Sequence, residues 1–413
     1  MKFRKETEFQ KTRIGEIPKE WKLEKLGRLV SYIKGRRPKR LYNEKLSEEF
    51  IPYLTAEYMR GLEKPKWCSL KEDPKVIRVQ YDDVIMIWDG SYSGHVFTGF
   101  EGVLASTMIK IFPSEEIDKR FLYYYLTKNF QKLRGTTVGT GIPHVNKKVF
   151  EELLIPLPSL NEQKRIAEIL LRVDNAIEGA DKAIVKLERL KRGLMSELLT
   201  GRIRVREENG RLSFHRETEL QETEVGEIPR GWHVVKLGEL IEMNHGERPE
   251  VILHEGDVPI YGGGGLYGFT NTYLVDKPYV LILARVGKGS VGKVYLARGR
   301  VWVTDNAIYG YSKDPNGITT VYAYYWLLFD KTWIEKYVRR SAGGYAIITL
   351  NSLNNLKLPL PPLNEQKGIT KIISTIDKAV DLHYKGKERL ERLKRGLMDL
   401  LLTGKVRVVD GDV

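Results

Sequence analysis

The sequence predicts an α+β protein in which two mixed α/β domains are separated by two long antiparallel coiled-coil helices and related by a pseudo-two-fold axis. Three observations predict this fold. The chain contains an internal repeat, each repeat ends in the pattern of a long helix, and the segments between the repeated motifs are unlike. With 413 residues, the chain is also too long for one ordinary domain.

Two motifs recur at the same spacing of 203 residues. LNEQKRIAEIL begins at Leu160, and LNEQKGITKII begins at Leu363. The nine residues LERLKRGLM are identical in the copies that begin at Leu187 and Leu390. Because both pairs have the same offset, nothing is inserted between the two motifs.

A third motif opens each half of the chain. RIGEIPKEWKLEKLG begins at Arg13, and EVGEIPRGWHVVKLG begins 211 residues later at Glu224, so the stretch that follows is eight residues longer in the first copy. The segment from Gly90 (GSYSGHVFTGF) has no obvious counterpart in the segment from Ala284 (ARVGKGSVGKV). Two similar frames therefore carry two unlike inserts.

Residues 160–200 contain no proline and repeat apolar residues at helical spacing. Ser159 and Glu162 resemble a capping box, and Gly201 lies where the helix would stop; in the second copy Pro362 and Gly404 hold these two places. A helix of about 40 residues spans about 60 Å. Because each helix has one apolar stripe, we expect the two to pack together; the alternative is that each folds onto its own domain.

The inserts mix short strands with turns and aromatic-rich helices. Strands are expected at 83–87, 103–112, 279–284 and 292–296, and amphipathic helices at 121–134 and 319–340. The expected divisions are a first α/β domain at 1–158, a first spacer helix at 159–201, a linker at 202–218, a second α/β domain at 219–361, a second spacer helix at 362–404 and a tail at 405–413.

The positive charge points to a polyanionic partner. The formal net charge is +14, and residues 1–159 hold 29 Lys and Arg against 21 Asp and Glu, whereas residues 160–200 hold eight against seven. This distribution fits helices that act as spacers and globular parts that touch DNA.

Cys68 is the only cysteine, which excludes an intrachain disulfide and a cysteine-based zinc site. No stretch approaches the roughly 20 apolar residues needed to cross a bilayer, and the first residues lack the apolar core of a signal peptide. The protein is therefore expected in the cytoplasm, without a membrane partner.

Polar and basic clusters that could reach DNA occur at matching places in the two inserts. Glycine permits close backbone approach, Arg and Lys contact phosphate, and Arg or Asn can read base edges. The first copy offers Lys34, Arg36, Arg37, Lys39, Arg40, Ser91, Tyr92, His95, Arg134, Thr137, His144 and Asn146. The second offers Arg248, Arg285, Lys288, Lys293, Arg339, Arg340 and Tyr345. For any single residue the competing interpretation is a solvated charge or an ordinary turn.

The run YGGGGLYG at residues 261–268 fits neither the dinucleotide-binding GxGxxG pattern nor the phosphate-binding GxxxxGK[ST] pattern. A flexible turn is expected instead. Tyr261 and Tyr267 could stack on bases or pack locally, and local packing is the favoured interpretation.

These motifs together resemble those of the specificity subunits of type I restriction–modification systems. The resemblance rests on IPLPSLNEQKRIAEIL from Ile155, LPLPPLNEQKGITKII from Leu358, LKRGLM followed by LLTG in both copies, and GEIP with a following Trp in each half. It covers nearly the whole chain, and two full copies argue against a half-length subunit.

The resemblance implies that each insert is a target recognition domain for one half of an asymmetric bipartite DNA site. The helices would then set the spacer and bind two modification subunits, which bind S-adenosylmethionine and methylate adenine. Restriction subunits would join for ATP- and Mg-dependent cleavage. No cofactor is expected in this subunit, and no contact residue is carried over from the family.

Two other classes of protein were weighed. A stand-alone adenine methyltransferase would need Asn or Asp before Pro-Pro and an aromatic residue after it, but the only pair, Pro361–Pro362, follows a leucine. A common restriction nuclease would need a Pro-Asp motif, which is missing, and the histidines are scattered. We therefore expect no catalytic or metal site. A non-specific coiled-coil scaffold remains possible, although two unlike basic inserts argue against it.

Overall fold

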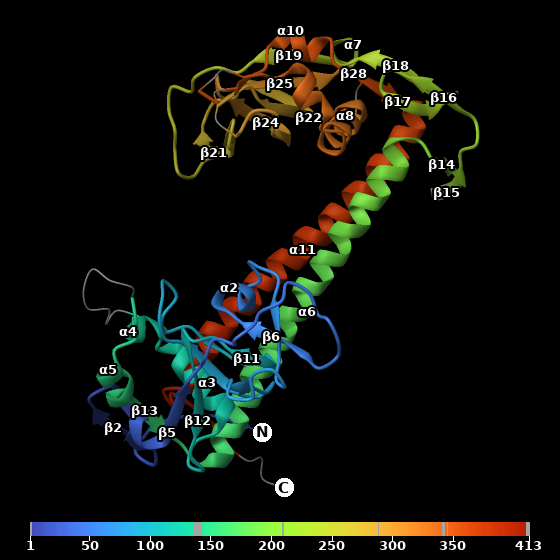
Figure 1. Ribbon diagram of the computed structural model, residues 1–413. Coiled ribbons are helices and arrows are strands. Elements are labelled where there is room, and N and C mark those ends of the chain that lie inside the picture. The colour runs from blue at the N-terminus through green and yellow to red at the C-terminus, as the bar shows by residue number, and fades with distance from the viewer. Residues whose placement is uncertain are drawn as a thin grey trace. The chain divides into compact units, whose positions relative to one another are not determined.

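The computed structural model describes residues 2–134, 143–208, 210–287, 289–314, 316–340, 343–344 and 346–409. It divides into two compact units (Figure 1). Unit 1 is built from both ends of the chain, Met1–Ala180 and Gly386–Val413, and unit 2 is the continuous segment Asp181–Lys385. Each unit mixes helices and strands, and the two long helices are present as α6 (Leu160–Leu199) and α11 (Leu363–Leu401), so the predicted fold class is confirmed.

Unit 1 contains two four-stranded sheets. One has the order β10 (Val96–Phe97), β9 (Val84–Ile87), β12 (Met108–Pro113), β5 (Val30–Lys34), and the other β7 (Lys66–Ser69), β6 (Phe50–Leu54), β11 (Gly102–Leu104), β8 (Arg78–Val79). All four residues of β9 are buried, as expected for a strand covered on both faces. The helices are α1 (Leu26–Leu29), α2 (Ala56–Met59), α3 (Lys119–Lys128), α4 (Phe130–Arg134) and α5 (Lys147–Glu152).

Unit 2 is built around a six-stranded sheet. Its order is β19 (Ile241–His245), β25 (Ala307–Ser312), β22 (Val275–Ala284), β24 (Val294–Val303), β20 (Val258–Gly262), β21 (Gly265–Thr270). A three-stranded sheet has the order β23 (Val286–Gly287), β27 (Ala346–Ile347), β26 (Arg339–Arg340), and β23 lies in the chain between β22 and β24 of the larger sheet. The helices are α7 (Leu237–Leu240), α8 (Ile318–Phe329), α9 (Thr332–Tyr337) and α10 (Leu350–Asn354).

The frame around each insert is the same in both units. It comprises the hairpin β2 (Phe9–Thr12)–β3 (Gly15–Pro18) and the pair β4 (Lys22–Lys25)–β13 (Leu154–Leu157) in unit 1. In unit 2 it comprises the hairpin β16 (Leu220–Thr223)–β17 (Gly226–Pro229) and the pair β18 (His233–Lys236)–β28 (Lys357–Leu360). The tryptophan of each GEIP motif, Trp21 or Trp232, is buried against the long helices.

Within each unit the two long helices pack against each other in opposite directions (Figure 1). In unit 1 Lys394 Nζ lies 2.6 Å from Asp174 Oδ1. In unit 2 Lys191 Nζ lies 2.5 Å from Asp377 Oδ1, and Tyr384 donates to Glu188 at 3.0 Å. Higher residue numbers in α6 therefore contact lower residue numbers in α11, which makes the two helices antiparallel. The packing of the two helices predicted from the apolar stripe is confirmed, and so is the antiparallel direction of the predicted fold class. The alternative that each helix folds onto its own domain is wrong.

Each unit contains an equivalent antiparallel strand pair, but the two strands are connected differently in the two units. In unit 2 the segment expected as a linker forms the hairpin β14 (Ile203–Glu208)–β15 (Arg211–Arg216). In unit 1 the expected tail contains β29 (Val406–Val409), which pairs antiparallel with β1 (Lys2–Lys5). The two ends of the chain therefore take the place of a hairpin loop.

The start of α6 shows how the frame is joined to the helices. The Ser159 hydroxyl accepts the Glu162 amide at 3.3 Å, which is the predicted cap. The Glu162 side chain does not complete a capping box, because its carboxylate binds the Arg407 guanidinium of β29 at 2.8 Å. In unit 2 Glu365 of α11 binds Arg204 of β14 in the same way, at 2.7 Å.

None of the helices in the described ranges is long and apolar enough to span a membrane.

Candidate nucleic-acid interface

In unit 1 a close backbone approach anchors the loop that carries most of the Lys and Arg residues predicted to contact DNA. The Gly35 amide donates to the Met108 carbonyl oxygen at 2.8 Å, and a Cβ on Gly35 would lie 2.1 Å from the Ala105 carbonyl oxygen. Only glycine fits such an approach. Arg37 is exposed and Pro38 is buried, so the arginine extends into solvent from a fixed loop.

Unit 2 repeats this arrangement with unlike neighbours. The Gly246 amide donates to the Ala307 carbonyl oxygen at 3.1 Å, and a Cβ on Gly246 would lie 2.2 Å from the Thr304 carbonyl oxygen. Arg248 and Pro249 follow at the same spacing as the Arg–Pro pair of unit 1. The equivalent place assigned to Arg248 from the sequence is therefore seen in the backbone contacts.

A glycine-closed turn forms the second part of each edge. In unit 1 the Gly94 amide donates to the Ile87 carbonyl oxygen at 2.7 Å, and in unit 2 the Gly292 amide donates to that of Ala284 at 3.1 Å. Both glycines have positive φ, +90° and +83°. The inserts that lack similarity in sequence thus share a hydrogen-bonded turn.

The segment before each long helix supplies the third part. The Val145 amide donates to the Trp88 carbonyl oxygen at 2.9 Å, and the Ile348 amide donates to that of Arg285 at 3.0 Å. In turn, the Trp88 amide donates to Thr107 and the Arg285 amide to Asn306, at 2.8 and 2.9 Å. In each unit the three predicted groups therefore meet at one edge of the insert.

The side chains of the unit 1 candidates differ in their surroundings. Lys34 Nζ lies 2.7 Å from Asp89 Oδ2. Within the described part of the chain, no side-chain partner is found for four exposed residues of the loop, Arg36, Arg37, Lys39 and Arg40. Ser91 is exposed as well.

The other unit 1 candidates take part in local structure. Tyr92 lies under the Arg60 guanidinium at 3.5 Å from its ring centroid, and the His95 ring packs on Phe130 at 4.1 Å. Three more lie near these: Arg134 is exposed beside the Phe130 ring, His144 pairs with Asp89 through the backbone, and the Asn146 side chain caps α5. Thr137 lies outside the described residues.

In unit 2 Arg285 supports a turn that carries one acidic side chain, Asp305, and one amide side chain, Asn306. Its Nη1 donates to the Asp305 carbonyl oxygen at 3.1 Å, while its buried Nε has no hydrogen-bond partner among the described residues. Lys293 is exposed, and Arg339 and Arg340 are exposed on β26, two strands from β23. Lys288 and Tyr345 lie outside the described residues.

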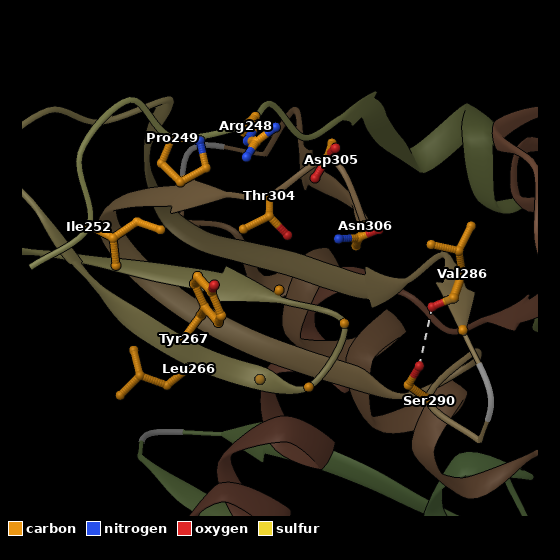
Figure 2. A pocket seen from close by; sticks show the side chains of 15 residues that line it. Arg248, Pro249, Ile252, Leu266, Tyr267, Val286, Ser290, Thr304, Asp305 and Asn306 are labelled. Carbon is orange, nitrogen blue, oxygen red and sulfur yellow. Dashed lines mark hydrogen bonds between the residues drawn. The ribbon is translucent and has the colours of Figure 1, made fainter. Parts of the chain in front are cut away.

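A pocket of about 730 Å³ opens at this edge of unit 2 (Figure 2). Its lining includes Arg248, Asp305, Asn306 and the glycine run 262–265. The run is the tight end of the β20–β21 hairpin rather than a phosphate-binding loop. Asp305 and Asn306 were not among the predicted residues, because no motif distinguishes TDNA from an ordinary turn.

The two tyrosines of the hairpin differ from each other. Tyr261 packs against the core of the sheet, as expected, and burial raises the pKa of its phenol. Tyr267 is instead 64% exposed at the rim of the pocket, where it is available to a ligand. In the part of the chain that the structure describes, no group of three His, Cys, Asp or Glu side chains is arranged to hold a metal ion.

Comparison with known proteins gives one consistent result. The sequence matches the type I restriction modification DNA specificity domain over residues 18–189 and again over 229–392, one match in each half. It is 33% identical to the type I restriction enzyme MjaVIII specificity subunit of Methanocaldococcus jannaschii, with 99% of this chain and 98% of that protein covered. The type I restriction enzyme EcoBI specificity subunit of Escherichia coli is 23% identical over 73% of this chain and 68% of its own.

The fold is also similar to a solved structure. The crystal structure of the type I restriction–modification system S subunit from M. genitalium aligns with a TM-score of 0.65, at 18% sequence identity. The alignment covers 92% of this chain and 96% of that one. At this level of identity the likeness concerns the fold.

Proposed function

Because the chain belongs to the type I restriction–modification DNA specificity family, we propose that unit 1 reads one half of an asymmetric bipartite DNA site and unit 2 reads the other. The chain is a DNA-sequence-specificity subunit, and its part in the complex is recognition rather than catalysis. Its basic edges supply the phosphate contacts that such recognition requires.

The observation that carries this proposal is the pair of like frames with unlike edges. Both units place an Arg–Pro pair, at Arg37 and Arg248, two residues after a glycine that makes the same close backbone approach. Beside it, unit 1 carries Ser106 and Thr107 where unit 2 carries Asp305 and Asn306. Because side chains of different hydrogen-bonding type favour different base edges, the two half-sites differ and the target is not a palindrome.

The long helices set the spacer and bind two modification subunits in this proposal. Leu190 of α6 and Leu393 of α11 are 203 residues apart and are 51% and 50% exposed, so the repeat presents the same apolar residue twice. The modification subunits would contribute S-adenosylmethionine and the methylation of adenine. Restriction subunits would contribute ATP- and Mg-dependent cleavage.

Mapping of methylated adenines in a host that carries the chain and its modification subunits tests this function. Exchange of the insert between Trp21 and Ile155 for that of a relative is expected to change one half-site only. Insertion of four residues at Gly179 of α6 and four at Gly386 of α11 is expected to lengthen the spacer and keep both half-sites; neither glycine has a neighbour that an added Cβ would touch. If both changes alter the same bases, the interpretation that the inserts determine the half-sites and the helices determine the spacer is wrong.

Two outcomes would favour the other classes. Methyl transfer by the purified chain alone would identify a stand-alone enzyme. Binding of the assembled complex to random duplexes without base preference would identify a scaffold, and it would leave the unlike edges without a role.

A further inference from the structure

The pocket of unit 2 brings together three polar side chains with unused hydrogen-bonding capacity. Arg248 comes from the loop after β19, and Asp305 and Asn306 come from the turn between β24 and β25 (Figure 2). All three are exposed, and within the described ranges none of these side chains has an ion pair or hydrogen bond. The Arg248 guanidinium offers several hydrogen-bond donors, the Asp305 carboxylate offers two acceptor oxygens, and the Asn306 amide offers both a donor and an acceptor.

The backbone holds these groups in place before any ligand arrives. The Arg285 amide donates to the Asn306 carbonyl oxygen at 2.9 Å, and Arg285 Nη1 donates to that of Asp305 at 3.1 Å. In the loop that carries Arg248, the carbonyl oxygen of the preceding residue, Glu247, accepts a hydrogen bond from the Trp302 indole at 2.8 Å. Such preorganisation lowers the ordering cost of recognition.

The charge of the pocket favours base edges over phosphate. Its described lining carries one arginine and one aspartate, so it is formally neutral in a chain of net charge +14. A phosphate would meet Asp305 as well as Arg248, whereas base edges present donors and acceptors side by side. Exposed Ile252, Leu266 and Tyr267 add apolar surface for a heterocycle or a thymine methyl group.

We propose that this pocket is the base-reading site of unit 2, in which the Asn306 amide reads an adenine and Arg248 reads a guanine in the major groove. The inference rests on the proposed function and names its reading residues. An asparagine amide matches adenine N6 and N7, and an arginine fork matches guanine O6 and N7. The glycine run 262–265 lets the DNA edge approach, because it adds no side chains to the floor.

The corresponding site of unit 1 supports a role in selection rather than in folding. Thr107 occupies the place of Asn306, since the Trp88 amide donates to its carbonyl oxygen as the Arg285 amide does in unit 2. The backbone bond is kept while the side chain changes. A residue needed only for the turn would not have to differ.

The test is selection of bound duplexes from a randomised pool by the full chain with modification subunits of its source. Asn306→Ala is expected to lose about 5- to 150-fold of the preference for adenine at one position of the unit 2 half-site. Asn306→Asp is expected to shift that position toward cytosine, because the carboxylate accepts from cytosine N4 and cannot donate to adenine N7. A change of preference cannot arise from misfolding.

Matched variants separate the possible outcomes. Asn271→Ala removes an exposed asparagine of unit 2 outside the pocket and is expected to change nothing, and Thr107→Ala is expected to affect the other half-site only. If the unchanged chain selects two half-sites and both Asn306 variants keep them, or relax a base other than adenine, the pocket assignment is overturned. If the unchanged chain selects no sequence, the proposed function itself fails.

Discussion

Arg407 and Glu162 form a two-point ion pair beneath the Trp21 indole, with Nε–Oε1 and Nη2–Oε2 distances of 2.8 Å each. The arginine and the carboxylate are both buried. Arg204 and Glu365 repeat the pair at 2.7 and 2.8 Å in unit 2. Each pair ties a strand at the end of one repeat to the start of the long helix of the other.

Arg407→Met is expected to destabilise unit 1 by about 3–5 kcal/mol, because it leaves a buried carboxylate without its partner. Replacing both members, as Arg407→Met with Glu162→Leu, is expected to recover only part of that loss, because the buried Glu6 carboxylate also loses its bond from Arg407. Urea unfolding followed by tryptophan fluorescence measures both. Arg172→Met, which breaks an exposed pair with Glu168, is the control and is expected to cost less than about 1 kcal/mol. Equal losses for Arg407 and Arg172 would contradict the prediction.

Low pH is expected to weaken the buried ion pairs of Arg407 by protonating its second partner, Glu6. Burial alone would raise the pKa of Glu6, but hydrogen bonds from the Glu8 amide and from Arg407 outweigh it and lower the pKa from 4.5 to about 2. A lowered folded-state pKa stabilises the protein fully above the unfolded value, and this stability is lost as the pH falls from 4.5 toward about 2. The denaturant midpoint of Glu6→Gln should show a weaker pH dependence in this window; an unchanged profile would argue against the assignment.

Gly246→Ala is expected to disturb the edge of unit 2 that carries Arg248. Its Cβ would lie 2.2 Å from the Thr304 carbonyl oxygen, so the backbone must move, at a cost of about 1–3 kcal/mol. Gly193→Ala in α6, also in unit 2 but outside the pocket and with no atom within 4 Å of the added Cβ, is the matched control. Thermal unfolding and duplex binding measure the two effects. A variant at Gly246 as stable and as selective as that at Gly193 would show that the close approach is dispensable.

The basic loop of unit 1 is expected to contribute charge without base preference. Arg36→Gln and Arg40→Gln should each reduce the slope of log K against log salt by about 0.9, because each removes one phosphate contact. The selected bases should stay the same. Lys71→Gln, at a lysine already paired with Glu49, serves as the control. A changed consensus would instead make these arginines base readers.

The frame could be predicted from the sequence because its signals are local and repeated. Ser159 and Gly201 mark the ends of α6 correctly to within two residues, and the apolar stripe predicts that the helix packs against a partner. The strand pair of β1 with β29 was missed, since nothing in a short tail indicates a partner at the far end of the chain.

The site was predictable only in part. Arg248 stood out because it follows glycine in a repeated position, and the three candidate groups of each insert do converge. Asp305 and Asn306 gave no such signal, since their placement depends on a turn held by the distant Arg285. Tyr267 could not be distinguished from Tyr261 by spacing, because register in the hairpin decides which ring faces the core.

The pairing of Lys2 with Val409 determines the order in which the two units can complete their folding during translation. Unit 2 is one continuous segment, so all of its residues are translated before the last part of unit 1. Unit 1 needs Gly386–Val413, which include the partner of its first strand, and it cannot be completed until these residues have been translated. The half of the protein that begins first is therefore finished last.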